Sequence, residues 1–328
     1  MQTFEYERAG SIDGALQSGE IQGSRFLAGG TNLLDLMKGG IEQPERIIDI
    51  SRLPLATVTE LPDGGLRIGA MVRNSDAANH PLVRTRYPLL SQAFLAGASP
   101  QLRNMASVGG NLMQRTRCYY FYDTAFPACN KRDPGSGCAA RDGYNRIHAL
   151  FGASDECVAT NPSDMSVALA ALDAVVEVRG ASDTRRIPIA DFHRLPGNTP
   201  QFDTTLKPGE LIVAVELPPS PFAAHAHYLK VRDRASYAFA LVSVAAGLDI
   251  RDGIVRDARV VLGGVAHKPW RVEAAERAIT GKQPGNGAIA AAARASVEGA
   301  QPLRHNAFKV ELARAAVTEA LQKARGRA

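Results

Sequence analysis

Arg25-Phe-Leu-Ala-Gly-Gly-Thr-Asn-Leu-Leu34 leads from an apolar segment through paired glycines into a helical pattern. It predicts a short strand over residues 25–28 and a helix over residues 33–38. Where a strand turns through glycines into a helix, free backbone N–H groups and the helix dipole favour an anion, usually phosphate. The stretch lacks the three spaced glycines of a Rossmann site and the lysine of a Walker loop, so it indicates neither fold. Taken alone, it is also compatible with a plain turn.

A second glycine turn strengthens the phosphate interpretation. Ala106-Ser-Val-Gly-Gly-Asn-Leu112 again couples paired glycines to small and polar residues. Paired glycines let a ligand approach the main chain closely. Serine and asparagine side chains supply donors and acceptors for a polar cofactor. The two turns together predict a site that grips the two ends of one dinucleotide.

The cysteines of the chain form one cluster in the sequence, directly after the second turn. All four, Cys118, Cys129, Cys138 and Cys157, fall within one stretch of 40 residues. Prolines and glycines lie between them, which predicts an irregular loop. Cysteines that serve only as small core residues would have unrelated positions. The clustering therefore indicates a metal or iron–sulfur site beside the glycine turns.

Three interpretations of the cysteine cluster compete. Two disulfides are disfavoured because a chain of this length buries ample core, and because its first residues do not have the layout of a secretory signal. Structural zinc usually uses pairs of cysteines with two to four intervening residues, and no such pair exists here. A [4Fe–4S] cluster tolerates long irregular spacing. Spacing alone leaves zinc and iron–sulfur open.

Composition limits the remaining possibilities. The 328 residues are 45% hydrophobic and 22% charged, which is typical of a soluble globular protein of two or three domains. No apolar run is long enough to span a membrane. The net charge of +5 is spread along the chain, so we expect no nucleic-acid partner and no membrane insertion. The seven histidines are dispersed, which argues against mononuclear zinc chemistry and hydrolysis.

Four ordered motifs carry a family resemblance over most of the chain. They are Phe26–Leu34, Ala106–Asn111, Asn161-Pro-Ser-Asp164 and Leu262-Gly-Gly-Val-Ala-His-Lys-Pro-Trp-Arg271. Together they resemble the FAD-binding subunit of the molybdenum hydroxylases, the xanthine dehydrogenase family. The cysteine-bearing insertion resembles that of bacterial heterotrimeric aldehyde oxidoreductases of the periplasmic type, and of the 4-hydroxybenzoyl-CoA reductase relatives. The resemblance thus implies that the four cysteines bind a [4Fe–4S] cluster.

The resemblance also implies cofactor-binding roles, and it assigns no catalytic residue to this chain. The FAD pyrophosphate would lie on Phe26, Leu27, Ala28, Gly29, Gly30, Thr31, Asn32, Leu33 and Leu34. The ribityl and phosphate region would contact Ser107, Gly110 and Asn111, and FAD hydroxyls would bond Asp164, whose simpler role is that of a helix cap. Ile212 and Lys230 match positions near the adenine and the flavin. Gln114 departs from the threonine common in relatives, which puts one flavin contact in doubt.

The implied fold class is α+β. Residues 1–220 would form a vanillyl-alcohol-oxidase (PCMH)-type FAD-binding domain in two lobes, with the Cys-rich loop at 114–160. Residues 221–328 would form a smaller α+β domain of the CO dehydrogenase flavoprotein type. Apolar and alternating runs predict strands over residues 174–178, 210–216, 241–245 and 260–262, with helices from Ala288 onward. The prolines of Leu217-Pro-Pro-Ser-Pro221 mark the boundary.

The function implied is that of an electron-transfer flavoprotein subunit of an aldehyde-oxidising enzyme. A large molybdenum-cofactor subunit and a small [2Fe–2S] subunit would complete the heterotrimer. Co-export with a partner that bears a signal would place it in the periplasm, and the alternative is the cytoplasm. Competing functions are the FAD subunit of a 4-hydroxybenzoyl-CoA reductase-like or xanthine dehydrogenase-like complex, a stand-alone NAD(P)H-dependent flavin reductase, and a noncatalytic iron–sulfur sensor or assembly module.

Overall fold

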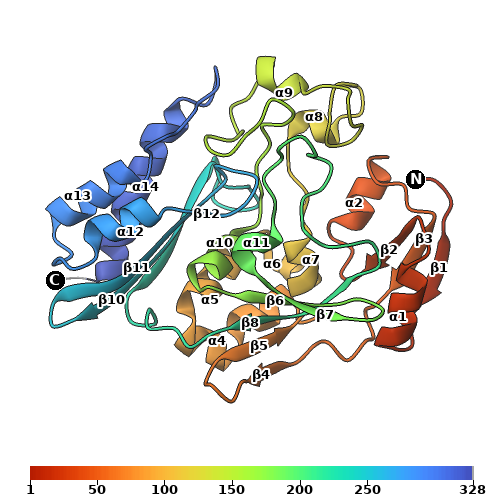
Figure 1. The fold of residues 1–328 in the computed structure, drawn as a ribbon, viewed down its shortest axis with the longest axis horizontal. Helices are drawn as coiled ribbons and strands as arrows, with labels where there is room; N and C mark the ends of the chain where they lie inside the picture. Colours follow the sequence, from red (N-terminus) through yellow and green to blue (C-terminus); the bar gives the residue numbers. More distant parts are fainter. Residues whose placement is uncertain (327–328) are drawn as a thin grey trace.

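Three β-sheets organise the computed structural model, which describes residues 1–326. A three-stranded sheet has the order β1-β3-β2, and both of its strand pairs are parallel. A five-stranded antiparallel sheet has the order β4-β5-β8-β6-β7. The third is a four-stranded antiparallel sheet of order β12-β11-β10-β9. In Figure 1 the first sheet and the third sheet lie at opposite ends of the molecule.

The first lobe is built by residues 5–49. Its elements are β1 (Glu5–Arg8), α1 (Ile12–Gly19), β2 (Ser24–Leu27), α2 (Leu33–Lys38) and β3 (Arg46–Asp49). Ser11 begins α1 because its hydroxyl accepts the N–H of Gly14 at 3.0 Å. The small core of this lobe includes Leu16 and Ile48, and it extends to Leu211 of the next lobe. The first glycine turn follows β2, and β2 packs against residues of both lobes.

The second lobe combines the five-stranded sheet with short helices. Its strands are β4 (Val58–Glu60), β5 (Leu66–Gly69), β6 (Val175–Arg179), β7 (Thr184–Pro188) and β8 (Leu211–Leu217). Its helices are α3 (Asn74–Asn79), α4 (Pro81–Arg86), α5 (Pro88–Ala96), α6 (Pro100–Arg103), α7 (Val108–Leu112), α10 (Asp164–Ala171) and α11 (Ile189–Phe192). Every residue of β8 is buried, since this strand lies in the middle of the sheet. The helix α10 is buried along its whole length as well.

The cysteine segment separates α7 from α10 and is largely irregular, as predicted. It contains two one-turn helices, α8 (Tyr119–Tyr122) and α9 (Ala139–Asp142). Its own small core joins the cysteines to apolar residues that include Phe121, Ala140 and Val158. Figure 1 shows the segment as a separate yellow and green lobe above the two flanking sheets.

The C-terminal part is a long hairpin covered by helices. The elements are β9 (Ala226–Val231), β10 (Val242–Arg251), β11 (Ile254–Gly263), β12 (Trp270–Arg271), α12 (Glu273–Ile279), α13 (Asn286–Ala295) and α14 (Phe308–Arg325). Valines and alanines of β10 and β11 pack against the alanines of α13 and α14. Alanine suits this face because it allows close packing and favours the helix.

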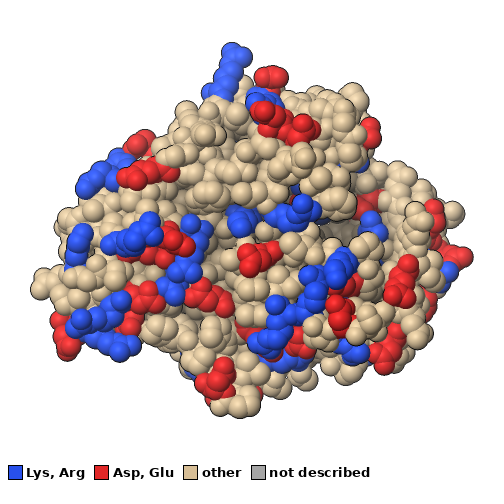
Figure 2. Space-filling view, in the orientation of Figure 1, with Lys and Arg blue, Asp and Glu red and all other residues tan. Residues whose placement is uncertain are grey.

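The predicted α+β class is confirmed, although several elements differ in length. The helix over residues 33–38 has the predicted bounds, and the strand predicted over 25–28 is β2. The strands predicted over 241–245 and 260–262 are parts of β10 and β11, which have ten residues each. None of the helices within residues 1–326 has both the length and the apolar character to cross a membrane. Figure 2 shows Lys and Arg interspersed with Asp and Glu on the visible face.

Candidate cofactor site

The two glycine turns lie against each other. A Cβ atom on Gly29 would lie 1.9 Å from the carbonyl oxygen of Met105, just before the second turn. No side chain fits there, so the close approach of the two turns requires glycine. Gly30 has φ +73°, the left-handed conformation that glycine adopts without strain. Gly29 and Gly30, on which the prediction of a phosphate loop depends, thus also lie where the two turns meet.

Backbone amides around the first turn are available to a ligand. Within residues 1–326, the N–H groups of Gly30, Thr31 and Asn32 donate to no protein acceptor. In the second turn, Ser107 caps α7, and its hydroxyl accepts the N–H of Gly110 at 3.2 Å. Buried or half-buried N–H groups seek an acceptor. An anionic group such as a pyrophosphate would satisfy those of the first turn.

A cleft of about 430 Å³ opens along these turns. It brings together the predicted residues Phe26, Leu27, Ala28, Gly29, Gly30, Thr31, Asn32, Leu33, Ser107, Gly110 and Ile212. Ile212 comes from the central strand β8, which forms a wall of the cleft. Four other predicted residues, Leu34, Asn111, Asp164 and Lys230, are not among the lining residues.

Asn111 instead connects the second turn to α10. Its Oδ1 accepts a hydrogen bond from the Ser163 hydroxyl at 2.8 Å and another from the Gln114 side-chain amide. Gln114, the departure from the family pattern, is therefore used to orient Asn111. The connection fixes the position of the second turn relative to Asp164, the residue after Ser163.

Asp164 and Lys230, which are far apart in the sequence, form a buried ion pair. The Asp164 Oδ2 lies 2.7 Å from Lys230 Nζ, and Oδ1 accepts the Tyr228 hydroxyl at 2.8 Å. Burial, with the Asp164 charge, raises the pKa of Tyr228 well above its usual value, so this hydroxyl stays a donor. The simpler role considered for Asp164, a helix cap, is wrong because Ser163 caps α10 by accepting the N–H of Ser166 at 3.0 Å.

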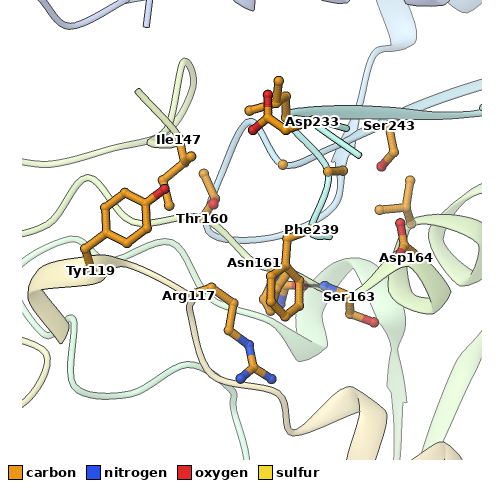
Figure 3. A pocket seen from close by; sticks show the side chains of 15 residues that line it. Arg117, Tyr119, Ile147, Thr160, Asn161, Ser163, Asp164, Asp233, Phe239 and Ser243 are labelled. Atoms are coloured by element: carbon orange, nitrogen blue, oxygen red, sulfur yellow. Dashed lines mark hydrogen bonds between the residues drawn. The ribbon is translucent and has the colours of Figure 1, made fainter. Parts of the chain in front are cut away.

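A second cavity, of about 150 Å³, lies beside this ion pair. Figure 3 shows Asp164 and Ser163 on one side of it, with Arg117 and Phe239 below and Tyr119 opposite. No pattern in the sequence singles out Arg117. Its guanidinium donates to the side chain of Asn32, which lines the larger cleft, and lies 4.8 Å from the centre of the Phe239 ring. Arg117 therefore stands between the two cavities.

A charged network links the larger cleft to the cysteine segment. Arg115 Nε donates to Asp203 Oδ2 at 2.8 Å, and Arg115 also pairs with Glu42. The fully buried Lys131 donates to Asp203 Oδ1 at 2.6 Å. Burial alone would raise the pKa of Asp203, but Lys131 and Arg115 outweigh it and hold that pKa below its usual value. Neither arginine in Arg115-Thr-Arg117 stood out in the sequence, because single arginines are common at surfaces.

All four cysteines are free thiols that converge in one small core. Cys129 and Cys138 face each other in an isolated antiparallel bridge. Cys138 accepts a hydrogen bond from Cys157, which lowers the pKa of Cys138 to about 6 and raises that of Cys157. Burial raises the pKa of Cys118 to about 12, although the backbone N–H groups of Phe121 and Tyr120 favour its thiolate.

The cysteines can be compared with the requirements of a metal group. Within the described residues, no group of three or more His, Cys, Asp or Glu side chains is placed to hold a metal ion. A [4Fe–4S] cluster instead needs four thiolates around a larger body. Backbone N–H groups point at the sulfurs of Cys118, Cys138 and Cys157, and the charge of the buried Lys131 acts on Cys157, which would suit such a negatively charged group.

Two family models match the chain in sequence. The FAD binding domain in molybdopterin dehydrogenase matches residues 2–220. The CO dehydrogenase flavoprotein C-terminal domain matches residues 227–324.

Similar proteins cover the same length. The aldehyde oxidoreductase FAD-binding subunit PaoB of Escherichia coli strain K12 is 53% identical over 330 residues, covering 100% of both chains. The glyceraldehyde dehydrogenase medium chain of Sulfolobus acidocaldarius is 28% identical and covers 85% of this chain and 82% of its own. Among solved structures, carbon monoxide dehydrogenase from Hydrogenophaga pseudoflava shares 27% identity with a TM-score of 0.76, covering 98% of this chain and 97% of that one.

The predicted resemblance is thereby confirmed. The two family models together leave few residues unmatched, and the fold and the FAD-binding assignment agree with both. The chain belongs to the xanthine dehydrogenase family of molybdenum hydroxylases, as an FAD-binding medium subunit of an oxidoreductase.

Proposed function

We propose that this chain is the electron-transfer flavoprotein subunit of a molybdenum-dependent aldehyde oxidoreductase. The observation that carries the flavin assignment is the contact between the two glycine turns, which opens a cleft lined by unpaired backbone amides. The aldehyde assignment is supported by the full-length identity of 53% to an aldehyde oxidoreductase subunit. In this role the chain binds and orients FAD, which supplies reversible two-electron chemistry.

The residues divide the binding task by their chemistry. The amides of Gly30, Thr31 and Asn32 would hold the pyrophosphate, with Ser107 and Gly110 on the adjoining phosphate and ribityl region. Ile212 would contact the apolar face of a ring system, since it lines the cleft from a rigid central strand. Asp164 would accept a hydroxyl, because a carboxylate has further acceptor positions besides those used by Tyr228 and Lys230.

The second cofactor in the proposal is a [4Fe–4S] cluster bound by Cys118, Cys129, Cys138 and Cys157. Its support is the convergence of four free, largely buried thiols in one core. Iron binds the thiolate form of cysteine, so binding would release the proton of Cys118 despite the raised pKa of this thiol.

The proposed assembly is a heterotrimer with a large molybdenum-cofactor subunit and a small [2Fe–2S] subunit. The aldehyde is oxidised on the large subunit, and the electrons leave through this chain to a terminal acceptor. The periplasm is the proposed compartment, reached by co-export with a partner, and the cytoplasm is the alternative.

The test is anaerobic purification of the complex after co-expression with the neighbouring open reading frames. We expect about one FAD and roughly four non-haem irons per copy of this chain, beyond those of the [2Fe–2S] subunit. An aldehyde should bleach the flavin absorbance. Absence of flavin would contradict the flavoprotein assignment, and stoichiometric zinc without iron would contradict the cluster. Bleaching of the full chain alone by NADPH, with turnover of a small substrate, would instead favour the stand-alone reductase.

A further inference from the structure

His148 lies directly against one of the four cysteines. Its Nε2 is 3.1 Å from Cys118 Sγ, and the residue is 1% exposed. A cysteine that ligates iron is a thiolate, which can only accept a hydrogen bond. With iron bound to Cys118, as proposed above, the hydrogen would be on Nε2 and the imidazole would donate it to the sulfur.

The backbone of His148 is held from the C-terminal part of the chain. Lys309 of α14 is completely buried, and its Nζ donates to the carbonyl of His148 at 2.9 Å and to that of Gly264 at 2.6 Å. The Asn306 side-chain amide donates to the carbonyls of His148 and Ala149, both at 3.1 Å. These bonds fix the peptide that carries the imidazole and so fix the direction of its N–H.

The other ring nitrogen of His148 makes no hydrogen bond. Nδ1 is buried and has no hydrogen-bond partner among the described residues. The contact of Nε2 with Cys118 is therefore the one polar contact of this ring in the described part of the chain. A core position that needed only packing would be filled at lower cost by an apolar side chain.

We propose that His148 is a positioning residue that raises the reduction potential of the iron–sulfur cluster through its hydrogen bond to Cys118. The inference rests on the proposed [4Fe–4S] cluster. A hydrogen bond to a ligand sulfur withdraws electron density from the cluster and stabilises the reduced form, which carries one more negative charge. Lys309 and Asn306 maintain the bond through the backbone carbonyls of His148 and Ala149.

The test is a potentiometric titration of the full chain without its partners, followed by the electron paramagnetic resonance of the reduced cluster. Replacement His148→Phe removes the donor, and we expect a roughly tenfold weaker tendency to be reduced, a shift of about 59 mV downward for a one-electron couple. His148→Gln retains an N–H donor and should stay closer to the wild type. The control is His305→Gln, because the His305 ring packs against Tyr144, 5.3 Å between ring centres, in the same region.

A second measurement can be decided on the wild type, so its outcome does not depend on whether a variant folds. In wild-type protein labelled with ¹⁵N-histidine, the reduced cluster should show a hyperfine coupling to one histidine nitrogen, and His148→Gln should lose it. An iron-loaded wild type without that coupling, or a His148→Phe variant with unchanged potential, overturns the inference and leaves the proposed function intact. A wild type that binds no iron and sulfide overturns both.

Discussion

At Gly29 the missing side chain allows the two glycine turns to pack against each other beside the cleft. The backbone of Met105 occupies the place of a Cβ atom, so the two turns approach more closely than any other residue would allow. The carbonyl of Met105 belongs to the main chain and cannot move aside as a flexible side chain would. A methyl group at Gly29 would therefore separate the two turns and widen the cleft between them.

We expect Gly29→Ala to lose FAD. The clash must be relieved by shifting one turn, which disturbs the amides that would hold the pyrophosphate, and a misplacement of about 1 Å can cost a hundredfold in a positioned site. The measurement is the flavin to protein ratio after purification, together with the FAD dissociation constant. Gly10→Ala is the matched control, since a Cβ there meets nothing within 4 Å. Full flavin content in Gly29→Ala would show that the contact of the turns is dispensable.

Among the elements, α10 and β9 are joined by the Asp164–Lys230 pair. Asp164 begins α10 in the second lobe, and Lys230 lies on β9 of the C-terminal sheet. Their side chains are only 8% and 4% exposed, so water screens the two charges poorly. Lys230 also donates to the carbonyl of Ala96, at the end of α5. The pair thus fixes α10 of the second lobe to β9 of the C-terminal sheet.

We expect Lys230→Met to destabilise the protein by about 3 kcal/mol or more, because it leaves the Asp164 carboxylate buried without its partner. The double variant Asp164→Asn with Lys230→Met should recover much of that loss, since no unpaired charge remains. Urea unfolding at a fixed excess of FAD measures both. If the double variant were as unstable as Lys230→Met, or more so, the unpaired charge would not be the cause.

Local patterns predicted some of these elements and could not reach others. The helix over residues 33–38 and the strand β8 followed from apolar runs beside clear turn residues. The full length of β10 and β11 did not, because Gly247 and the charged residues Asp249 and Asp257 interrupt the apolar pattern. For the site, the glycine turns were visible in the sequence. The roles of Arg117 and of His148 depend on contacts with residues 85 and 30 positions away, which no local pattern records.

In the molecule as a whole, the cysteine segment is fastened on two sides. Lys131 ties it to Asp203 of the second lobe, while Leu150 donates its N–H to Val265 at 2.8 Å in the C-terminal part. Lys309 adds the contact from α14. The C-terminal helices therefore help to fix the position of the four thiols. Because Lys309 makes one of these contacts, the stability of the folded chain should depend on whether Lys309 is protonated.

The pH dependence of stability should reveal this coupling. Burial lowers the pKa of Lys309 to about 7 from the ordinary lysine value of 10.5. Between these pH values the unfolded chain binds more protons than the folded one, so this group makes folding more favourable as pH rises. We expect the stability of the wild type relative to Lys309→Met to rise by about 1.4 kcal/mol per pH unit in that window, and to level off below pH 7. Chemical denaturation of both proteins from pH 6 to pH 10 measures the difference, in which the contributions of other titrating groups cancel.

The control is Lys323→Met, because Lys323 is on the same helix but is half exposed and paired with Glu319. This variant should show no such slope. Parallel stability curves for wild type and Lys309→Met would mean that the ammonium is solvated in solution, and that α14 does not hold the cysteine segment through this residue.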